Sequence, residues 1–176
     1  SLSFDSSERL GLAAPSGFGK TTFCKILAGY EKPDEGLVLL DGKPLSEYKG
    51  YCPVQLIWQH PQEAVNPRRK MKTVLEEGGV LDERLIHGLG IEKEWMERYP
   101  GELSGGELQR FCIARALGEK TSFLLADEIT AMLDLITQSQ IWNFLLEEVR
   151  SREIGLLVVS HSEPLLQRIC TGRIQL

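Results

Sequence analysis

Apolar residues follow two different patterns along the chain. Residues 123–126 and 156–159 are unbroken apolar runs, which is typical of strands in a parallel sheet covered on both faces. Elsewhere apolar residues recur every three or four positions, which indicates helices with one buried face. Such positions are Phe23, Ile26 and Leu27; Leu108, Phe111, Cys112 and Ala116; and Leu135, Trp142, Leu145, Leu146 and Val149. This alternation predicts an α/β fold with a mostly parallel core sheet and right-handed crossovers.

Shorter signals complete the predicted order of elements. Residues 8–14 are typical of a strand that runs into a glycine-rich turn, and Gly29 and Pro33 end a helix that begins near Thr21. Asp41-Gly42 is a turn signal after a strand predicted at 36–40. We also expect a strand at 55–59, a short helix at 165–170 and a final strand at 173–176.

The composition changes between residues 61 and 102. From Glu76 to Glu102 there are eight acidic and three basic residues, with glycines at 78, 79, 88 and 90. This segment predicts small helices that form a lobe outside the main sheet. We therefore expect a single domain spanning 1–176, with a core of residues 1–60 and 104–176 and a helical subdomain at about 61–103.

Composition places the chain among globular domains. Its 176 residues suffice for one domain with a full core, and 42% are hydrophobic and 26% charged. The net charge of −5 gives no general attraction for nucleic acid, so no nucleic-acid partner is expected. The one basic cluster, at residues 68–72, is short and favours a solvated surface patch over a polyanion site.

Cysteine spacing and apolar run length bear on location. The thiols form no C-x-x-C pair, which favours buried thiols in a reducing cytosol over disulfides or a zinc site. No apolar run approaches the roughly 20 residues that cross a bilayer, and we expect no signal peptide. We therefore expect a cytoplasmic location, with another chain supplying any channel. The cysteines are Cys24, Cys52, Cys112 and Cys170.

Residues 14–22 join the first predicted strand to the first predicted helix. Backbone amides in such a loop converge on phosphate oxygens, and the helix dipole adds partial positive charge. In the pattern G-x-x-x-x-G-K-[ST], the lysine reaches the β- and γ-phosphates and the next hydroxyl binds Mg²⁺. The alternative is an ordinary strand–turn–helix corner, because alanine stands at the first glycine position. The candidate nucleotide-binding residues are Ala14, Pro15, Ser16, Gly17, Phe18, Gly19, Lys20, Thr21 and Thr22.

Two carboxylates follow the apolar run at 123–126. Asp127 would hold a magnesium ion, and Glu128 would orient and polarise an attacking water. Two adjacent acids are also a common polar exit from a strand, so the pair alone leaves both interpretations open. Its position after a phosphate loop favours the catalytic one.

Residues 103–110, L-S-G-G-E-L-Q-R, resemble the signature sequence of ATP-binding-cassette (ABC) ATPases. Ser104, Gly105 and Gly106 expose amides at a helix start, which makes an anion site. Ser104 and Glu107 also match a capping box, which by itself only starts a helix. Capping alone does not require the glycine pair, so both roles fit this segment.

Other landmarks fall in the order found in that family. By resemblance, Gln59 reaches the magnesium and links to the helical lobe, Asp134 contacts the opposite subunit, and His161 touches the γ-phosphate. Taken alone, Asp134 would be a helix cap and His161 a satisfied histidine at a strand end. Because the resemblance spans residues 10–176, these weak signals support one another.

The resemblance also implies a fold, cofactors and partners. The fold would be a P-loop NTPase with an antiparallel N-terminal β part beside the parallel sheet and the helical subdomain. ATP would be clamped between the phosphate loop of one subunit and residues 104–107 of a second, in a homo- or heterodimer. The dimer would drive a transmembrane permease at the inner face of the cell membrane. The implied metal ligands are Thr21, Gln59 and Asp127, and the implied catalytic residues are Lys20, Glu128 and His161.

Several positions depart from the family pattern. Glu107 replaces the common glutamine, and Ile129 stands where proline usually follows the catalytic glutamate. The aromatic residue that stacks on adenine normally lies upstream of the phosphate loop. Phe4 is a candidate for that role, although a buried strand phenylalanine is the stronger interpretation.

Residues 59–68, with Tyr99-Pro100, resemble the corresponding segments of peptide and nickel importers, although the lobe is shorter than in most of them. Three alternatives remain: an ABC ATPase not coupled to transport, a nucleotide-binding module with little turnover, and a P-loop kinase. Only 44 residues separate Gln59 from Ser104, which argues against ABC repair proteins with long coiled-coil insertions. A kinase has no need of the signature or of His161.

Overall fold

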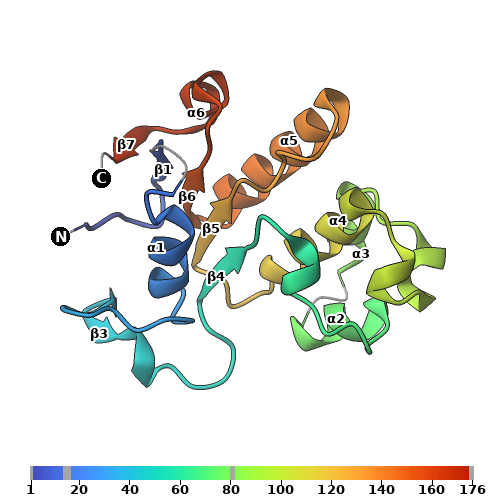
Figure 1. The fold of residues 1–176 in the computed structure, drawn as a ribbon, viewed down its shortest axis with the longest axis horizontal. Helices are drawn as coiled ribbons and strands as arrows, with labels where there is room; N and C mark the ends of the chain where they lie inside the picture. The colour runs from blue at the N-terminus through green and yellow to red at the C-terminus, as the bar shows by residue number, and fades with distance from the viewer. Residues whose placement is uncertain (1, 14–16, 80–81, 175–176) are drawn as a thin grey trace.

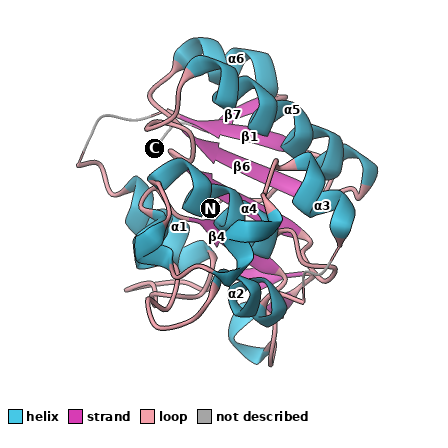
Figure 2. Ribbon diagram, turned by 90° about the vertical axis from the view of Figure 1, so that its right-hand side faces the viewer, coloured by secondary structure: helices cyan, strands magenta, loops and turns pink. Residues whose placement is uncertain are grey.

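A computed structural model describes residues 2–13, 17–79 and 82–174. Five strands form one sheet whose neighbours all run parallel, in the order β4-β5-β6-β1-β7 (Figures 1 and 2). The parallel core sheet predicted from the apolar runs is therefore confirmed. The strands are β1 (Arg9–Leu12), β4 (Val54–Ile57), β5 (Phe123–Asp127), β6 (Gly155–Val159) and β7 (Gly172–Ile174).

The register aligns the carboxyl ends of the three central strands. Val159 of β6 pairs with Asp127 of β5 on one side and with Leu12 of β1 on the other. Residues that follow these strands therefore emerge at one edge of the sheet, where ligands of parallel α/β folds bind.

Helices cover both faces of the sheet (Figure 1). One face packs on α1 (Lys20–Leu27), and the other packs on α4 (Gly105–Ala116) and α5 (Leu135–Ser151). Alternate strand residues supply the two cores, so Leu157 lies in the first and Leu156 in the second. A short helix, α6 (Glu163–Ile169), precedes β7.

The segment after β4 folds into small helices to one side of the sheet, as the composition predicts (Figure 1). It contains α2 (Met71–Glu77), α3 (Glu83–Gly88) and the 3₁₀ turns η2 (Pro61–Glu63), η3 (Lys93–Glu97) and η4 (Pro100–Glu102). We call residues 61–103 the lobe. Its buried side chains join the same hydrophobic cluster as α4, α5 and one face of the sheet, so the lobe has no separate core.

The N-terminal half contains a small antiparallel hairpin. β2 (Leu39–Leu40) pairs with β3 (Lys43–Pro44) across a turn with positive φ at Asp41 (52°) and Gly42 (74°), so the predicted turn is confirmed. Of the strand predicted at 36–40, only residues 39 and 40 form a strand, because no described strand pairs with residues 36–38. A 3₁₀ turn, η1 (Leu45–Glu47), follows.

Some burial predictions are wrong. Leu135 is 82% exposed, because it is the first residue of α5 and this turn extends beyond the packed face. Phe4 lies outside any strand, half-buried, with its ring 5.1 Å from that of Phe123. Cys52 and Cys170 are only partly buried, whereas Cys24 and Cys112 are buried and all four thiols are free.

The burial of α4 and the start of β7 also differ from the prediction. α4 is buried around most of its circumference rather than along one face, because the lobe covers its outer side. β7 begins at Gly172, and the last two residues of the strand predicted at 173–176 lie outside the described residues. None of the helices in the described ranges has both the length and the hydropathy to cross a membrane.

Candidate functional site

The loop between β1 and α1 has the backbone of a phosphate cradle. Gly17 (φ 81°) and Gly19 (φ 78°) are left-handed, and an added Cβ on either would meet no atom within 4 Å. Glycine adopts this conformation without strain, and the open space leaves room for a ligand close to the backbone. Lys20 begins α1 and is 7% exposed. The candidates Ala14, Pro15 and Ser16 lie outside the described residues.

A hydrogen bond joins α1 to the end of β5. The hydroxyl of Thr21 donates to Oδ2 of Asp127 over 2.7 Å, although the two residues are 106 positions apart. Asp127 is 2% exposed. Its charge also acts on the neighbouring turn of α1, where burial and then Asp127 raise the pKa of the Cys24 thiol far above its usual range. The two proposed protein oxygens for a metal are thus adjacent.

Glu128 has a constrained backbone and a mostly covered side chain, of which 10% is exposed. Its φ is 51°, in the left-handed region, and its N–H donates to the carbonyl of Val159 over 3.0 Å. Burial raises the pKa of the Glu128 carboxyl, and the charges of His161 and Lys20 partly oppose that rise. Within the described residues Oε1 of Glu128 accepts no hydrogen bond, although Nε2 of His161 lies 3.4 Å away. Strained non-glycine backbone of this kind is concentrated at functional sites.

His161 follows β6 at the same edge of the sheet. Its side chain is 52% exposed, so it reaches past the buried end of the strand toward solvent. Ser160 is 6% exposed, and its hydroxyl accepts a hydrogen bond from the N–H of Ser162 over 3.1 Å. Glu128 and His161 both line a cavity of about 280 Å³ between the ends of β5 and β6.

Comparison with known protein families shows the family of the chain. A family profile described as ABC transporter matches residues 1–131. This chain belongs to the ABC transporter family. As an ATPase of that family, it binds ATP and hydrolyses it. The signature resemblance and the recognition of the fold from sequence are therefore confirmed.

Similar proteins with assigned names include import ATP-binding proteins. It is 33% identical to the nickel import ATP-binding protein NikE of Rhodospirillum rubrum, over 96% of this chain and 68% of that protein. It is 34% identical to the glutathione import ATP-binding protein GsiA of Pectobacterium atrosepticum, over 96% of this chain and 30% of the relative. GsiA is thus much longer than the matched part.

Solved cassettes share the fold. A post-hydrolysis dimer of the ATP-binding cassette MJ0796 with ADP and phosphate superposes with a TM-score of 0.83 at 22% identity, covering 99% of this chain and 86% of the other. A second dimeric MJ0796 structure gives 0.80 at 25% identity, covering 96% and 81%. The P-loop NTPase fold predicted from the resemblance is confirmed.

In the signature turn, Ser104 and Glu107 form hydrogen bonds with each other. Ser104 Oγ accepts from the N–H of Glu107 over 3.2 Å, and Glu107 Oε2 accepts from the N–H of Ser104 over 2.7 Å. The predicted capping box is thereby confirmed. Gly105 has open space around it, whereas a Cβ on Gly106 would lie 3.0 Å from Leu133 of the loop after β5. No hydrogen bond among the described residues joins Ser104 or Glu107 to the carboxylates at the sheet edge.

Asp134 begins α5 as its cap. Its Oδ1 accepts hydrogen bonds from the N–H groups of Ile136 and Thr137, each over 3.0 Å, so the capping interpretation is confirmed. The side chain of Thr137, and then the N–H groups of Thr137 and Ile136, lower the pKa of the Asp134 carboxyl by hydrogen bonding to it. The exposed apolar residues Met132, Leu135 and Ile136 surround it.

Gln59 lies just beyond β4 and is half-buried. Next to it, the carbonyl of Trp58 accepts from Nε2 of Gln109 on the signature helix over 3.2 Å. The amide oxygen of Gln109 is buried and has no partner among the described residues. Sequence reasoning missed Gln109. The available signal was a polar residue between Leu108 and Phe111 on the buried side of a helix.

Proposed function

We propose that the cassette is the motor of an importer and hydrolyses ATP in a site shared by two cassettes. The observation that carries this proposal is the Thr21–Asp127 hydrogen bond directly beside Glu128, which is partly buried and has a left-handed backbone. A hydroxyl, a metal-binding carboxylate and a base candidate at a helix N-terminus are the parts that phosphoryl transfer to water needs.

The chain's own groups fit a magnesium ion. Thr21 and Asp127 would hold it, with Gln59 as a further ligand. The described residues contain no cluster of three or more His, Cys, Asp or Glu side chains suited to a metal. That agrees with Mg²⁺, which keeps several waters and binds through one or two carboxylates together with substrate phosphates. When bound, the ion would supply positive charge that neutralises the phosphates.

The remaining residues at the edge divide the work of the reaction. Amides of residues 14–22 and the Lys20 ammonium bind the phosphates and offset the charge that develops on them. The unpartnered oxygen of Glu128 orients the attacking water and accepts a hydrogen bond from it. His161, exposed at the same edge, donates toward the γ-phosphate.

The second half of the site would come from the partner cassette. The Ser104 turn is exposed, and the N–H groups of Gly105 and Gly106 at the start of α4 have no acceptor within the helix. Residues Ser104, Gly105, Gly106 and Glu107 of one copy would face the phosphates held by the other, with Asp134 at the interface. The similar cassette MJ0796 is dimeric in a solved structure, which supports a site formed between two copies.

Subunit mixing tests the shared site. Lys20→Ala removes the lysine that would bind the phosphates, and Ser104→Arg places a bulky side chain at the signature turn. Each variant alone is therefore expected to be inactive. A one-to-one mixture forms mixed dimers that contain one intact site, so phosphate release should return to roughly a quarter of the unaltered rate. Full activity of either variant alone, or no recovery on mixing, contradicts a site shared by two copies.

We further propose that the dimer acts on a membrane permease at the inner face of the membrane to import nickel or a peptide. The names of the relatives NikE and GsiA and the segment at 59–68 support this proposal. In cells of the source organism whose chain carries Glu128→Gln, uptake of the transported cargo should fall. Measuring the uptake of radioactive nickel and of labelled glutathione then shows which of the two is the cargo. Unchanged uptake of both contradicts both.

A further inference from the structure

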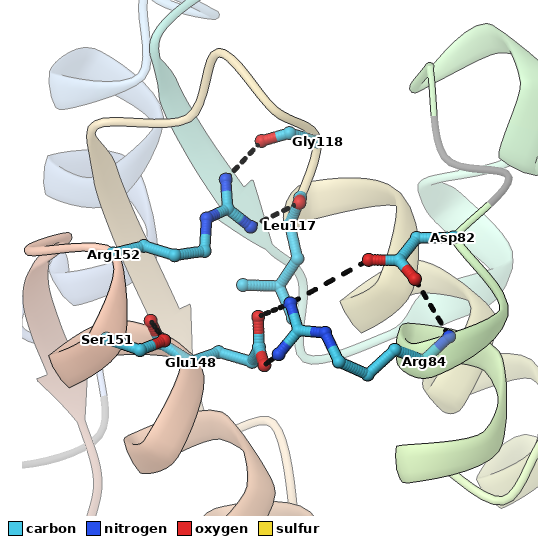
Figure 3. Close-up of polar contacts among 7 residues, drawn as sticks. All are labelled: Asp82, Arg84, Leu117, Gly118, Glu148, Ser151 and Arg152. Carbon is cyan, nitrogen blue, oxygen red and sulfur yellow. Dashed lines mark hydrogen bonds and ion pairs between the residues drawn. The ribbon is translucent and has the colours of Figure 1, made fainter.

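Helix α3 of the lobe rests on α5 through two contacts one turn apart. Arg84 donates from both terminal nitrogens to the two carboxylate oxygens of Glu148, with Nη2 and Oε2 3.0 Å apart (Figure 3). One turn along each helix, a Cβ on Gly88 would lie 2.0 Å from the ring of Phe144. The pairs 84/148 and 88/144 therefore run antiparallel along one seam.

The carboxylate in this seam is fully enclosed. Glu148 is 0% exposed, whereas the Arg84 side chain is 59% exposed. A buried carboxylate requires a partner, and the planar guanidinium fork fixes the direction of approach as well as the distance. Beside the seam, α3, η3 and α5 together line a groove of about 1210 Å³. The ion pair thus adds a directional contact between α3 and α5, beside the burial of Leu85 and Leu89 in the shared core.

The held helix in turn contacts the signature helix. α3 ends at Gly88, and the carbonyl of the next residue, Leu89, accepts a hydrogen bond from Arg110 of α4. The far end of α4 is held by α5 itself, because Arg152 donates to the carbonyls of Leu117 and Gly118 over 2.7 Å each (Figure 3). α4 is therefore joined at its middle to the end of α3 and just beyond its own end to Arg152, in addition to its packing on α2, η2 and β4.

We propose that Arg84 and Glu148 are positioning residues for ATP hydrolysis. Their ion pair holds α3 on α5, and α3 sets, through Arg110, the direction in which the Ser104 turn faces the partner cassette. This inference rests on the proposed function, because it requires that turn to act on the nucleotide.

The decisive variant replaces both partners with apolar residues. Arg84→Met/Glu148→Met leaves no unpaired buried charge, so the chain should unfold at a temperature close to that of the unaltered chain. Binding of a fluorescent ATP analogue to the monomer should stay within about two-fold, whereas turnover at saturating ATP should fall about ten-fold, because the turn is misplaced. Normal turnover at normal stability overturns the inference.

Two further variants serve as a second test and as a control. If the double variant does not fold, Arg84→Lys decides, since it keeps the charge but loses the fork. Unchanged turnover in Arg84→Lys overturns the inference, and reduced turnover with unchanged nucleotide binding supports it. Lys70→Met is the matched control, because it breaks the exposed Lys70–Glu97 pair of the same lobe and should leave turnover unaltered.

Ser104→Arg, measured in the same assay, separates this inference from the proposed function. If Ser104→Arg hydrolyses ATP normally, the shared site itself fails. If Ser104→Arg is inactive while the double Met variant is fully active, only the positioning role fails.

Discussion

The two halves of the proposed site are built in different ways. At the sheet edge, Thr21 bonds to Asp127, and Glu128 lies next to His161, so groups from three separate elements meet within one chain. At the signature turn, Ser104 and Glu107 satisfy each other and the turn meets none of those groups. The first half depends on tertiary structure, whereas the second is local and complete. Under the proposed function, the signature turn would therefore act on nucleotide held at the sheet edge of a second copy.

Glu128→Gln is expected to have the largest effect. It leaves the sheet edge in place but removes the base, so phosphate release should fall about 10²- to 10⁴-fold. Nucleotide binding measured by fluorescence should remain, because the phosphate loop is unchanged. Near-normal hydrolysis by this variant would remove Glu128 from the mechanism and leave the sheet edge as a binding site only.

Leu75→Ala tests whether the lobe is separable from the sheet. Leu75 is 0% exposed and belongs to the cluster shared with α4 and α5, so its truncation should lower the free energy of unfolding by about 2–5 kcal/mol. Because the cluster is continuous, denaturation followed by circular dichroism should show one shifted transition. A separate early transition confined to the lobe would show that the signature turn is carried by an independent unit.

Ser104→Ala measures how much the cap of α4 contributes to stability. Loss of the reciprocal cap should cost about 1 kcal/mol of stability, measured by urea denaturation. The comparison is Ser162→Ala at the start of α6, where the hydroxyl accepts over a longer 3.4 Å, and a smaller loss is expected there. Equal losses would mean that the capping box adds nothing beyond an ordinary cap.

The pH dependence gives the smallest effect and concerns the sheet edge alone. Because burial raises the pKa of Glu128, the base is protonated at a higher pH than an ordinary glutamate, and hydrolysis should decline early on the acid side. A raised carboxyl pKa in the folded chain means that this group favours folding below its unfolded pKa and loses that contribution as pH rises through the folded pKa.

The same shift can be checked through stability. Glu128→Gln should make the chain more stable than the unaltered chain at neutral pH, and the difference should vanish in acid, where Glu128 is protonated. Thermal unfolding at several pH values measures this difference. A variant that is less stable at neutral pH would show that the carboxylate is stabilised rather than strained at this edge.

The sequence by itself determined the parts whose causes are short-range. The apolar runs predicted β5 and β6, the S-x-x-E pattern predicted the cap of α4, and Asp41-Gly42 predicted the hairpin turn, because each depends on residues within a few positions. The motif order also identified the family. The roles assigned to Lys20, Gln59, Asp134 and the other site residues stay predictions.

Tertiary structure alone decided what the strand order brings together. Thr21 meets Asp127 because β1 and β5 both flank β6, and no local pattern contains that pairing. The left-handed backbone of Glu128 and the Arg84–Glu148 seam likewise depend on neighbours far away in the chain. Helical spacing placed Leu135 on a buried face, but spacing cannot tell where the packed partner ends, so only the fold showed it exposed.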